Sequence, residues 1–173
     1  VKEFATVSQM VEFSTMISTT DKTKNKSIFS RIKTVDENYP LFGKVGYEPI
    51  GVFEKLQTTE NTILVNENIF KNLNLELNDK IKVQDKLFTV IGIVKSVPDI
   101  GGAFVFGDFA LTGKKTLNAL NLNNLGSFLN YEYKVKFNKG ISILDGIKKV
   151  EELFVNEEQV IIRKSDNAAG GLK

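Results

Sequence analysis

Carboxylates, lysines and tyrosines are the side chains with which this 173-residue chain could carry out acid–base or covalent chemistry, because it contains no histidine and no cysteine. Zinc sites built from imidazole or thiolate, and nucleophiles activated by histidine, are therefore excluded within the chain. Asp36 and Glu37 are adjacent, but neighbours on an extended chain point to opposite sides and are poorly placed to share a proton. We interpret this pair as a solvated loop face.

Two other ionisable residues would be reactive only if the fold buried them. Glu12 lies among the apolar residues of an expected strand, but it shares its even positions with Ser8 and Ser14, which predicts exposure. Lys95 ends an expected central strand, where a lysine usually extends into water and does not serve as a Schiff-base nucleophile. No glycine-rich phosphate loop is present. The sequence thus predicts no catalytic residue, no cofactor site and no metal site.

Charge and hydropathy narrow the class of protein further. The net charge is +2, from 23 basic and 21 acidic residues, and the only arginines are Arg31 and Arg163, a pattern that disfavours nucleic-acid binding. The longest apolar run, residues 90–94, is far shorter than the roughly 20 residues of a membrane span. Because the chain starts at Val1 without a signal peptide, we expect an excised fragment whose flanks have room for membrane segments.

Hydrophobic periodicity predicts the elements that must position these side chains. Period-two or continuous apolar runs indicate strands at 7–17, 27–35, 62–65, 80–84, 87–97, 109–111, 131–137 and 159–163. Capping residues and helical spacing indicate helices at 67–72, 113–122 and 143–155. We therefore expect an α+β fold with mixed or antiparallel sheets, about eight strands and three helices. It would form a single domain over residues 1–165, in one or two lobes, followed by a flexible tail at 166–173.

Aromatic side chains gather in the loop that follows the second expected strand. Pro40 forces Tyr39 to be extended, and Gly43 can adopt positive φ. Two interpretations of this loop are open: it folds over the core as a satellite cluster, or it forms an exposed apolar patch for a partner protein or membrane. The apolar residues concerned are Tyr39, Leu41, Phe42, Tyr47, Ile50 and Phe53.

The segment 31–43, RIKTVDENYPLFG, resembles the extracytoplasmic domain of MacB/FtsX-type ABC transporter permeases. The permease branch associated with lysophospholipase or thioesterase partners has a similar Val-x-x-x-Tyr-Pro-Leu-x-Gly loop after a hairpin. The resemblance continues at 64–65, 78–83, 88–94 and 98–99, and covers the chain from about Phe13 to Phe154. A departure is Gly107-Asp108, where relatives are expected to carry a proline-arginine pair.

This resemblance implies a domain that is moved and is not an enzyme. The full-length permease would hold it between the first and second membrane helices, on the periplasmic side of a bacterial cell membrane, while a separate cytoplasmic subunit hydrolyses ATP. The domain would transmit that motion to an envelope protein, a lipid or other hydrophobic cargo.

Cargo extraction implies an apolar cleft. The residues expected to contact partner or cargo are Tyr39, Pro40, Leu41, Phe42, Phe104 and Phe106, and those expected to shape the loops are Gly43, Pro98, Gly101 and Gly102. Two alternatives stay open: a free-standing enzyme that uses carboxylates from distant segments, and a passive envelope assembly module.

Overall fold

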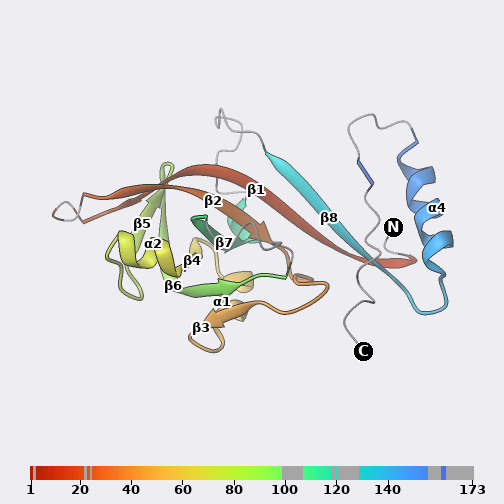
Figure 1. The fold of residues 1–173 in the computed structure, drawn as a ribbon, viewed down its shortest axis with the longest axis horizontal. Helices are drawn as coiled ribbons and strands as arrows, with labels where there is room; N and C mark the ends of the chain where they lie inside the picture. The colour runs from red at the N-terminus through yellow and green to blue at the C-terminus, as the bar shows by residue number, and fades with distance from the viewer. Residues whose placement is uncertain are drawn as a thin grey trace. The chain divides into compact units, whose positions relative to one another are not determined.

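The computed structural model describes residues 1, 3–21, 23, 25–98, 107–117, 120, 129–155 and 161–162. These residues form eight strands and four helices (Figure 1). In chain order they are β1 (Ala5–Thr19), β2 (Ser27–Val35), β3 (Gly46–Glu48), α1 (Val52–Thr58), β4 (Thr62–Asn66), α2 (Glu67–Asn72), β5 (Lys80–Val83), β6 (Lys86–Ser96), β7 (Phe109–Gly113), α3 (Lys114–Leu117), β8 (Asn130–Phe137) and α4 (Ile143–Leu153).

The chain divides into two compact units. The larger unit is Val7–Val135, and the smaller one combines Val1–Thr6 with Lys136–Lys173. The expected flexible tail at 166–173 lies outside the described residues, and the single domain expected over 1–165 stays a prediction.

Six strands of the larger unit close into a ring. The pairs β1–β2, β4–β7, β5–β6 and β1–β5 are antiparallel, whereas β2–β7 and β4–β6 are parallel. Because β1 pairs with both β2 and β5, the order β1-β2-β7-β4-β6-β5 returns to its start. The short strand β3 pairs with β6, and β8 pairs with β1, so both lie off the ring. Each of the six strands therefore has a neighbour within the ring on both sides, although β1 and β6 also extend beyond the ring pairing to β8 and β3.

Two apolar clusters occupy the two faces of these strands. The first receives buried side chains from all six ring strands and is therefore the interior of the ring; α2 adds Ile69 to it. The second lies on the outer face of the ring, beneath Phe53 and Leu56 of α1 and beneath Tyr39. Strand β6 contributes to both clusters, as predicted from its continuous apolar run.

The α+β class and most elements agree with the sequence. Helix α2 has the expected bounds, and Asn66 caps it by accepting a hydrogen bond from the Ile69 amide at 3.0 Å. The sequence did not predict β3 or α1, and the helix expected at 113–122, of which α3 is the described part, lies partly outside the described residues. The N-cap residue that precedes α1 is Gly51, whose φ is 85° and which has no side chain to cap the helix, so the usual sequence marker is absent. The strand expected at 159–163 lies mostly outside the described residues.

The helical spacing of Leu144, Ile147 and Val150 predicts one buried face of α4, and the period of two in 131–137 predicts that the charged face of β8 is the exposed one; the structure differs from both predictions. In α4, Leu144 was expected on the buried face but is 72% exposed, and the helix instead packs through Gly146. A Cβ at Gly146 would lie 2.6 Å from the Phe137 ring, so this close approach sets the rotation of the helix. In β8, Tyr131 and Tyr133 are exposed, whereas Lys134 faces toward the protein. Within the described residues, no helix has the length and apolar character needed to cross a membrane.

Candidate functional site: the tyrosine-proline pocket

A buried carboxylate fixes the loop that follows β2. Asp36 is only 5% exposed, and its side chain accepts hydrogen bonds from Ser8 Oγ at 2.8 Å, the Gln9 amide at 2.7 Å and the Asn38 amide at 3.1 Å. The predicted solvated face is therefore wrong for Asp36, and the predicted exposure of Ser8 is wrong too. Because β1 pairs with β2, Ser8 and Asp36 lie next to each other, and their hydrogen bond allows both polar side chains to be buried.

The same network holds Tyr39. Its amide donates to the Asp36 carbonyl at 3.3 Å, and the Gln57 side chain of α1 donates to the carbonyls of Asp36 and Tyr39 at 2.9 and 3.1 Å. The Tyr39 ring is buried in the outer cluster, with its centroid 6.4 Å from that of Phe53, and Tyr47 stacks on Phe53 at 5.4 Å. This part of the aromatic loop folds over the core, as the first interpretation expected.

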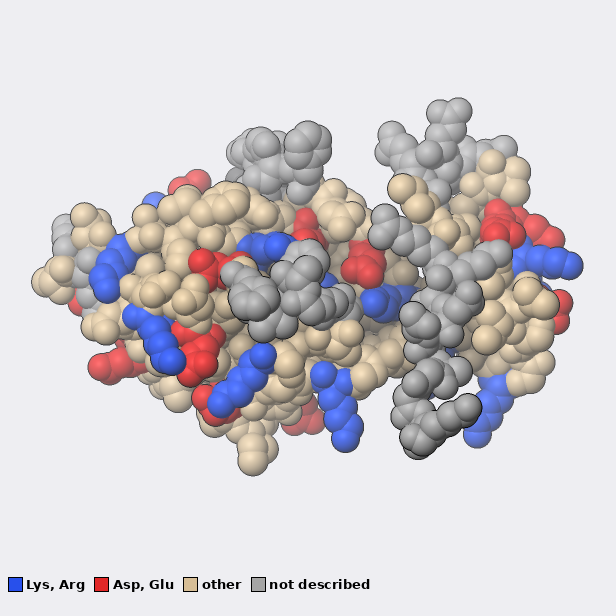
Figure 2. Space-filling view, viewed as in Figure 1, with Lys and Arg blue, Asp and Glu red and all other residues tan. Residues whose placement is uncertain are grey.

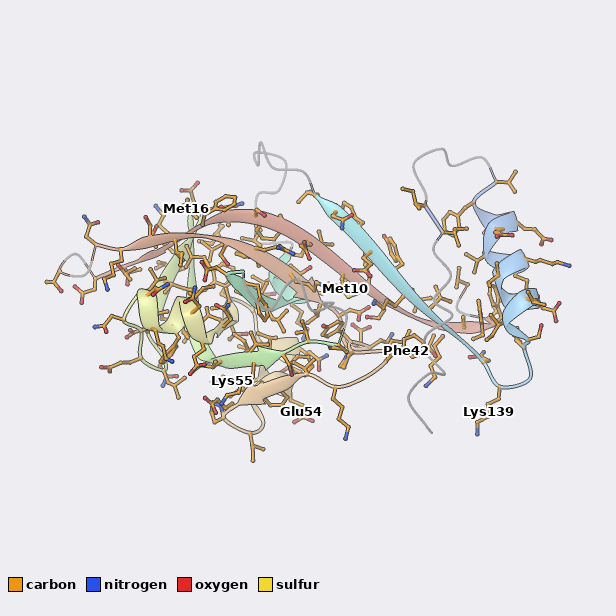
Figure 3. All side chains as sticks on the ribbon, in the orientation of Figure 1. Met10, Met16, Phe42, Glu54, Lys55 and Lys139 are labelled. Carbon is orange, nitrogen blue, oxygen red and sulfur yellow. The ribbon has the colours of Figure 1, made fainter. Side chains whose placement is uncertain are left out.

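The rest of the loop forms one wall of a small pocket. Gly43 has φ 75°, and a Cβ at this position would lie 2.5 Å from the Cβ of Pro98, so the turn packs tightly on the end of β6. Phe42, labelled in Figure 3, is 44% exposed. The pocket has a volume of about 160 Å³ and is lined by Tyr39, Pro40, Leu41, Phe42, Gly43, Pro98 and Lys134.

The size of this tyrosine-proline pocket limits what it can hold. A volume of about 160 Å³ corresponds to about five water molecules and is below the 300 Å³ or more of typical small-molecule sites. The lining is mostly apolar, with one charged residue, Lys134, whose Nζ lies 3.5 Å from Glu132 Oε1. Such a pocket fits one apolar side chain better than a lipid.

The structure brings six of the ten predicted site residues together around this pocket: Tyr39, Pro40, Leu41, Phe42, Gly43 and Pro98. The other four, Gly101, Gly102, Phe104 and Phe106, lie outside the described residues. Sequence reasoning missed Lys134, which comes from a strand far along the chain, and it missed the anchoring role of Asp36. No local pattern marks either residue.

The candidate reactive residues have ordinary environments. Lys95 is half exposed and its Nζ lies 2.7 Å from Glu48 Oε2, and this hydrogen bond raises the pKa of the lysine. A Schiff-base lysine needs a lowered pKa, so Lys95 is not suited to that role. Its half-exposed side chain extends into water, as predicted. Glu12 is partly exposed and lies 3.6 Å from Arg31 Nε and 3.9 Å from Lys33 Nζ.

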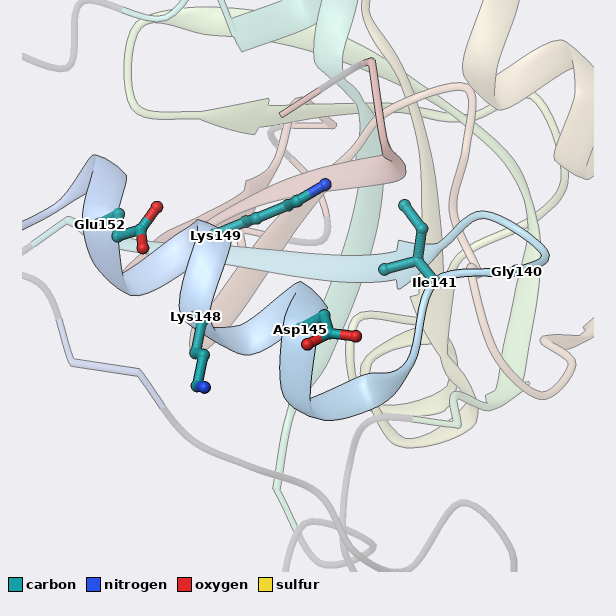
Figure 4. A pocket seen from close by; sticks show the side chains of 6 residues that line it. All are labelled: Gly140, Ile141, Asp145, Lys148, Lys149 and Glu152. Atoms are coloured by element: carbon teal, nitrogen blue, oxygen red, sulfur yellow. The ribbon is translucent and has the colours of Figure 1, made fainter.

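A second, more open pocket lies in the smaller unit. Its volume is about 400 Å³, and charges of both signs line it, with Lys148 and Lys149 pointing in different directions (Figure 4). No group of three or more acidic, histidine or cysteine side chains able to hold a metal occurs in the described part of the chain. Positive and negative side chains are interspersed on the face shown in Figure 2. These features do not form a recognisable ligand site.

Comparison with known proteins gives a consistent result at the level of fold. No protein-family profile matches the sequence, and no curated protein matches it. Among solved structures, the periplasmic region of MacB from Actinobacillus actinomycetemcomitans superposes with a TM-score of 0.59 at 16% identity, over 86% of this chain and 65% of that one. The chain thus spans slightly less than two thirds of that MacB structure.

Two other structures agree. A domain assigned to a permease protein of Porphyromonas gingivalis has a TM-score of 0.59 at 12% identity, over 90% of this chain and 71% of that one. The extracellular domain of the ABC-type transporter YknZ from Gram-positive bacteria has a TM-score of 0.56 at 9% identity, covering 83% and 68%. The chain therefore has the fold of the extracytoplasmic domains of ABC transporter permeases.

Proposed function

We propose that this chain is the extracytoplasmic domain of an ABC transporter permease and that it acts mechanically, without catalysing a reaction. The observation that carries the proposal is the shared fold: three solved domains of transporters or permeases match between 83% and 90% of the chain. The Tyr-Pro loop, whose sequence resembles the corresponding loop of such permeases, also lines the pocket and is therefore the proposed contact surface.

In this proposal the full-length protein sits in a bacterial cell membrane with this domain on the periplasmic side. A cytoplasmic ATP-binding subunit drives the membrane helices, and the helices bias the domain between two packed arrangements. Within this proposal we assign the chain to the branch of permeases associated with lysophospholipase or thioesterase partners, because its Tyr-Pro loop resembles the loop of that branch.

The tyrosine-proline pocket is the proposed contact with an envelope partner. Its position is preorganised, because Asp36, Gln57 and Gly43 fix the loop before any partner arrives. Its volume favours a single apolar side chain of a protein or lipoprotein over a whole acyl chain. Phe42 at the exposed side of the loop would cover that side chain.

The test uses the full-length protein, cysteine-free apart from one introduced residue, reconstituted in proteoliposomes with the ATP-binding subunit encoded beside it. The rate at which maleimide labels Phe42→Cys is expected to change severalfold between the nucleotide-free and the vanadate-trapped states. Ile50→Cys is the matched control, because Ile50 is exposed in a neighbouring loop and does not line the pocket. A full-length protein found entirely in the water-soluble fraction would refute the membrane assignment, and equal changes at both positions would refute the pocket.

A further inference from the structure

The outer edge of β8 is suited to pair with another strand. β8 stands last in the strand order and, within the described residues, has one strand neighbour, β1. It is eight residues long, longer than the usual strand of about five or six, and no proline or glycine interrupts it. An unpaired edge of this kind exposes backbone groups that can hydrogen bond to a further strand.

The side chains along this edge alternate in character. Tyr131 and Tyr133 point to one face and are 51% and 57% exposed. Glu132 and Lys134 point to the other face, both partly exposed. The Gln9 side chain of β1 donates a hydrogen bond to the Tyr133 hydroxyl at 3.0 Å, which fixes the orientation of that ring.

This alternation makes β8 complementary to a second, antiparallel copy of β8. If two copies of β8 run antiparallel about a two-fold axis through Tyr133, residue 133 lies opposite its own copy, and Glu132 lies opposite Lys134 of the other chain twice. The same register places Tyr131 opposite Val135. Opposite charges and aromatic or aromatic–β-branched pairs at directly opposed positions each stabilise a sheet.

Neighbouring registers lack this match. Moving the axis to residue 132 places two glutamates opposite each other, and moving it to residue 134 does the same with two lysines. Charged residues on an edge strand usually discourage pairing. Here their alternating signs discourage most partners but favour a second copy in one register.

We propose that β8 pairs with β8 of a second copy of this chain, antiparallel and centred on Tyr133, so that the sheet continues across a two-fold axis. The paired segment, residues 131–135, is short, so the contact is small and the association weak and reversible. Within one strand, Glu132 and Lys134 already form an ion pair at 3.5 Å. Because this pair is partly exposed and therefore weak, exchanging it for pairs between the two copies costs little. Pairing at this edge is a property of the chain itself and holds whether or not the chain works in a permease.

Single-cysteine variants test the register directly, because the chain contains no cysteine of its own. Two copies of Tyr133→Cys would face each other at a separation compatible with a disulfide and are expected to form a covalent dimer rapidly under mild oxidation. Tyr131→Cys is the matched control, with the same side chain replaced on the same face at similar exposure. Its two copies would lie about 14 Å apart along the strands, too far for a disulfide. Equal rates for the two variants would overturn the proposal.

Charge reversal tests the reason for the register. In the Tyr133→Cys background, Lys134→Glu is expected to slow dimer formation roughly tenfold, because it opposes like charges twice. Adding Glu132→Lys to Lys134→Glu is expected to restore the original rate. A Lys134→Glu variant that dimerises as fast as its parent, or a double swap that stays slow, would overturn the proposal.

A measurement on the unsubstituted chain guards against loss of folding in these variants. Amide hydrogen exchange at residues 131–135 is expected to slow as protein concentration rises from micromolar to millimolar, whereas exchange in β5, inside the ring, stays constant. Exchange at 131–135 that is independent of concentration would also overturn the proposal.

Discussion

The interior of the strand ring and the loop over its outer face are held in place by different forces. The interior consists of apolar side chains from six strands, each buried by the others. The outer loop adds the Tyr39 ring to a second apolar cluster, but hydrogen bonds to the buried residue Asp36 determine the path of the loop. The fold therefore depends on apolar packing, while the tyrosine-proline pocket depends on a polar network that can be disrupted locally.

The largest effect should come from the interior. Phe88→Ala removes a fully buried ring and is expected to lower the free energy of unfolding by about 3–5 kcal/mol, measured by urea denaturation. Leu87→Ala is the control, because Leu87 is adjacent but exposed, and it should change stability by less than about 0.5 kcal/mol. Similar losses for both variants would contradict the closed ring.

Removing the polar anchor should have a somewhat smaller and more local effect. Asp36→Ala leaves three hydrogen-bond donors without their acceptor and is expected to lower the free energy of unfolding by about 2–4 kcal/mol. Asp36→Asn should lower it less, because the amide oxygen of asparagine can still accept a hydrogen bond. Trypsin should cleave the variant faster at the exposed Lys44 than it cleaves the parent chain.

The control for the anchor is Glu37→Ala, which replaces the exposed neighbouring carboxylate and should leave both stability and cleavage unchanged. If Asp36→Ala unfolded the whole chain without faster local cleavage, the distinction between the two regions would fail.

A third prediction separates backbone strain from contact at the pocket. Gly43→Ala places a side chain on a residue with positive φ, and its new Cβ would lie 2.5 Å from the Cβ of Pro98. This substitution should lower the free energy of unfolding by about 2–3 kcal/mol. Gly51→Ala has a similar φ of 85° but no atom within 4 Å of the new Cβ, so only strain, about 1 kcal/mol, is expected. Thermal unfolding of both variants measures the difference, and equal shifts would show that Gly43 does not pack on Pro98 as described.

The smallest effect on stability should come from the exposed ion pair between Lys95 of β6 and Glu48 of β3. The hydrogen bond to Glu48 raises the pKa of Lys95, so its contribution to stability is present at neutral pH and lost as pH rises through the raised pKa. Glu48→Gln should return that pKa toward its ordinary value, which NMR titration of the Lys95 ammonium group can follow. Because the pair is solvent-exposed, stability at neutral pH should barely change. A Lys95 pKa unaffected by Glu48→Gln would contradict the pairing.

Local patterns were sufficient to predict most elements of the fold. Period-two or continuous apolar runs marked the ring strands, and the helix cap at Ser142, whose hydroxyl accepts a hydrogen bond from the Asp145 amide at 3.1 Å, followed from residue type and spacing. The Tyr-Pro-Leu-Phe-Gly turn was recognisable because proline and glycine restrict the backbone directly. These features depend on residues a few positions apart.

Tertiary structure alone decided which face each element buries and how the pocket is completed. Ser8 and Asp36 are 28 positions apart, and neither is marked for burial until β1 and β2 pair. Lys134 reaches the pocket from β8, and Gly146 sets the rotation of α4 by its approach to Phe137. Periodicity identifies an element and its two faces, but burial is a property of the partner that covers a face. That partner comes from a distant part of the chain, so the local sequence cannot specify it.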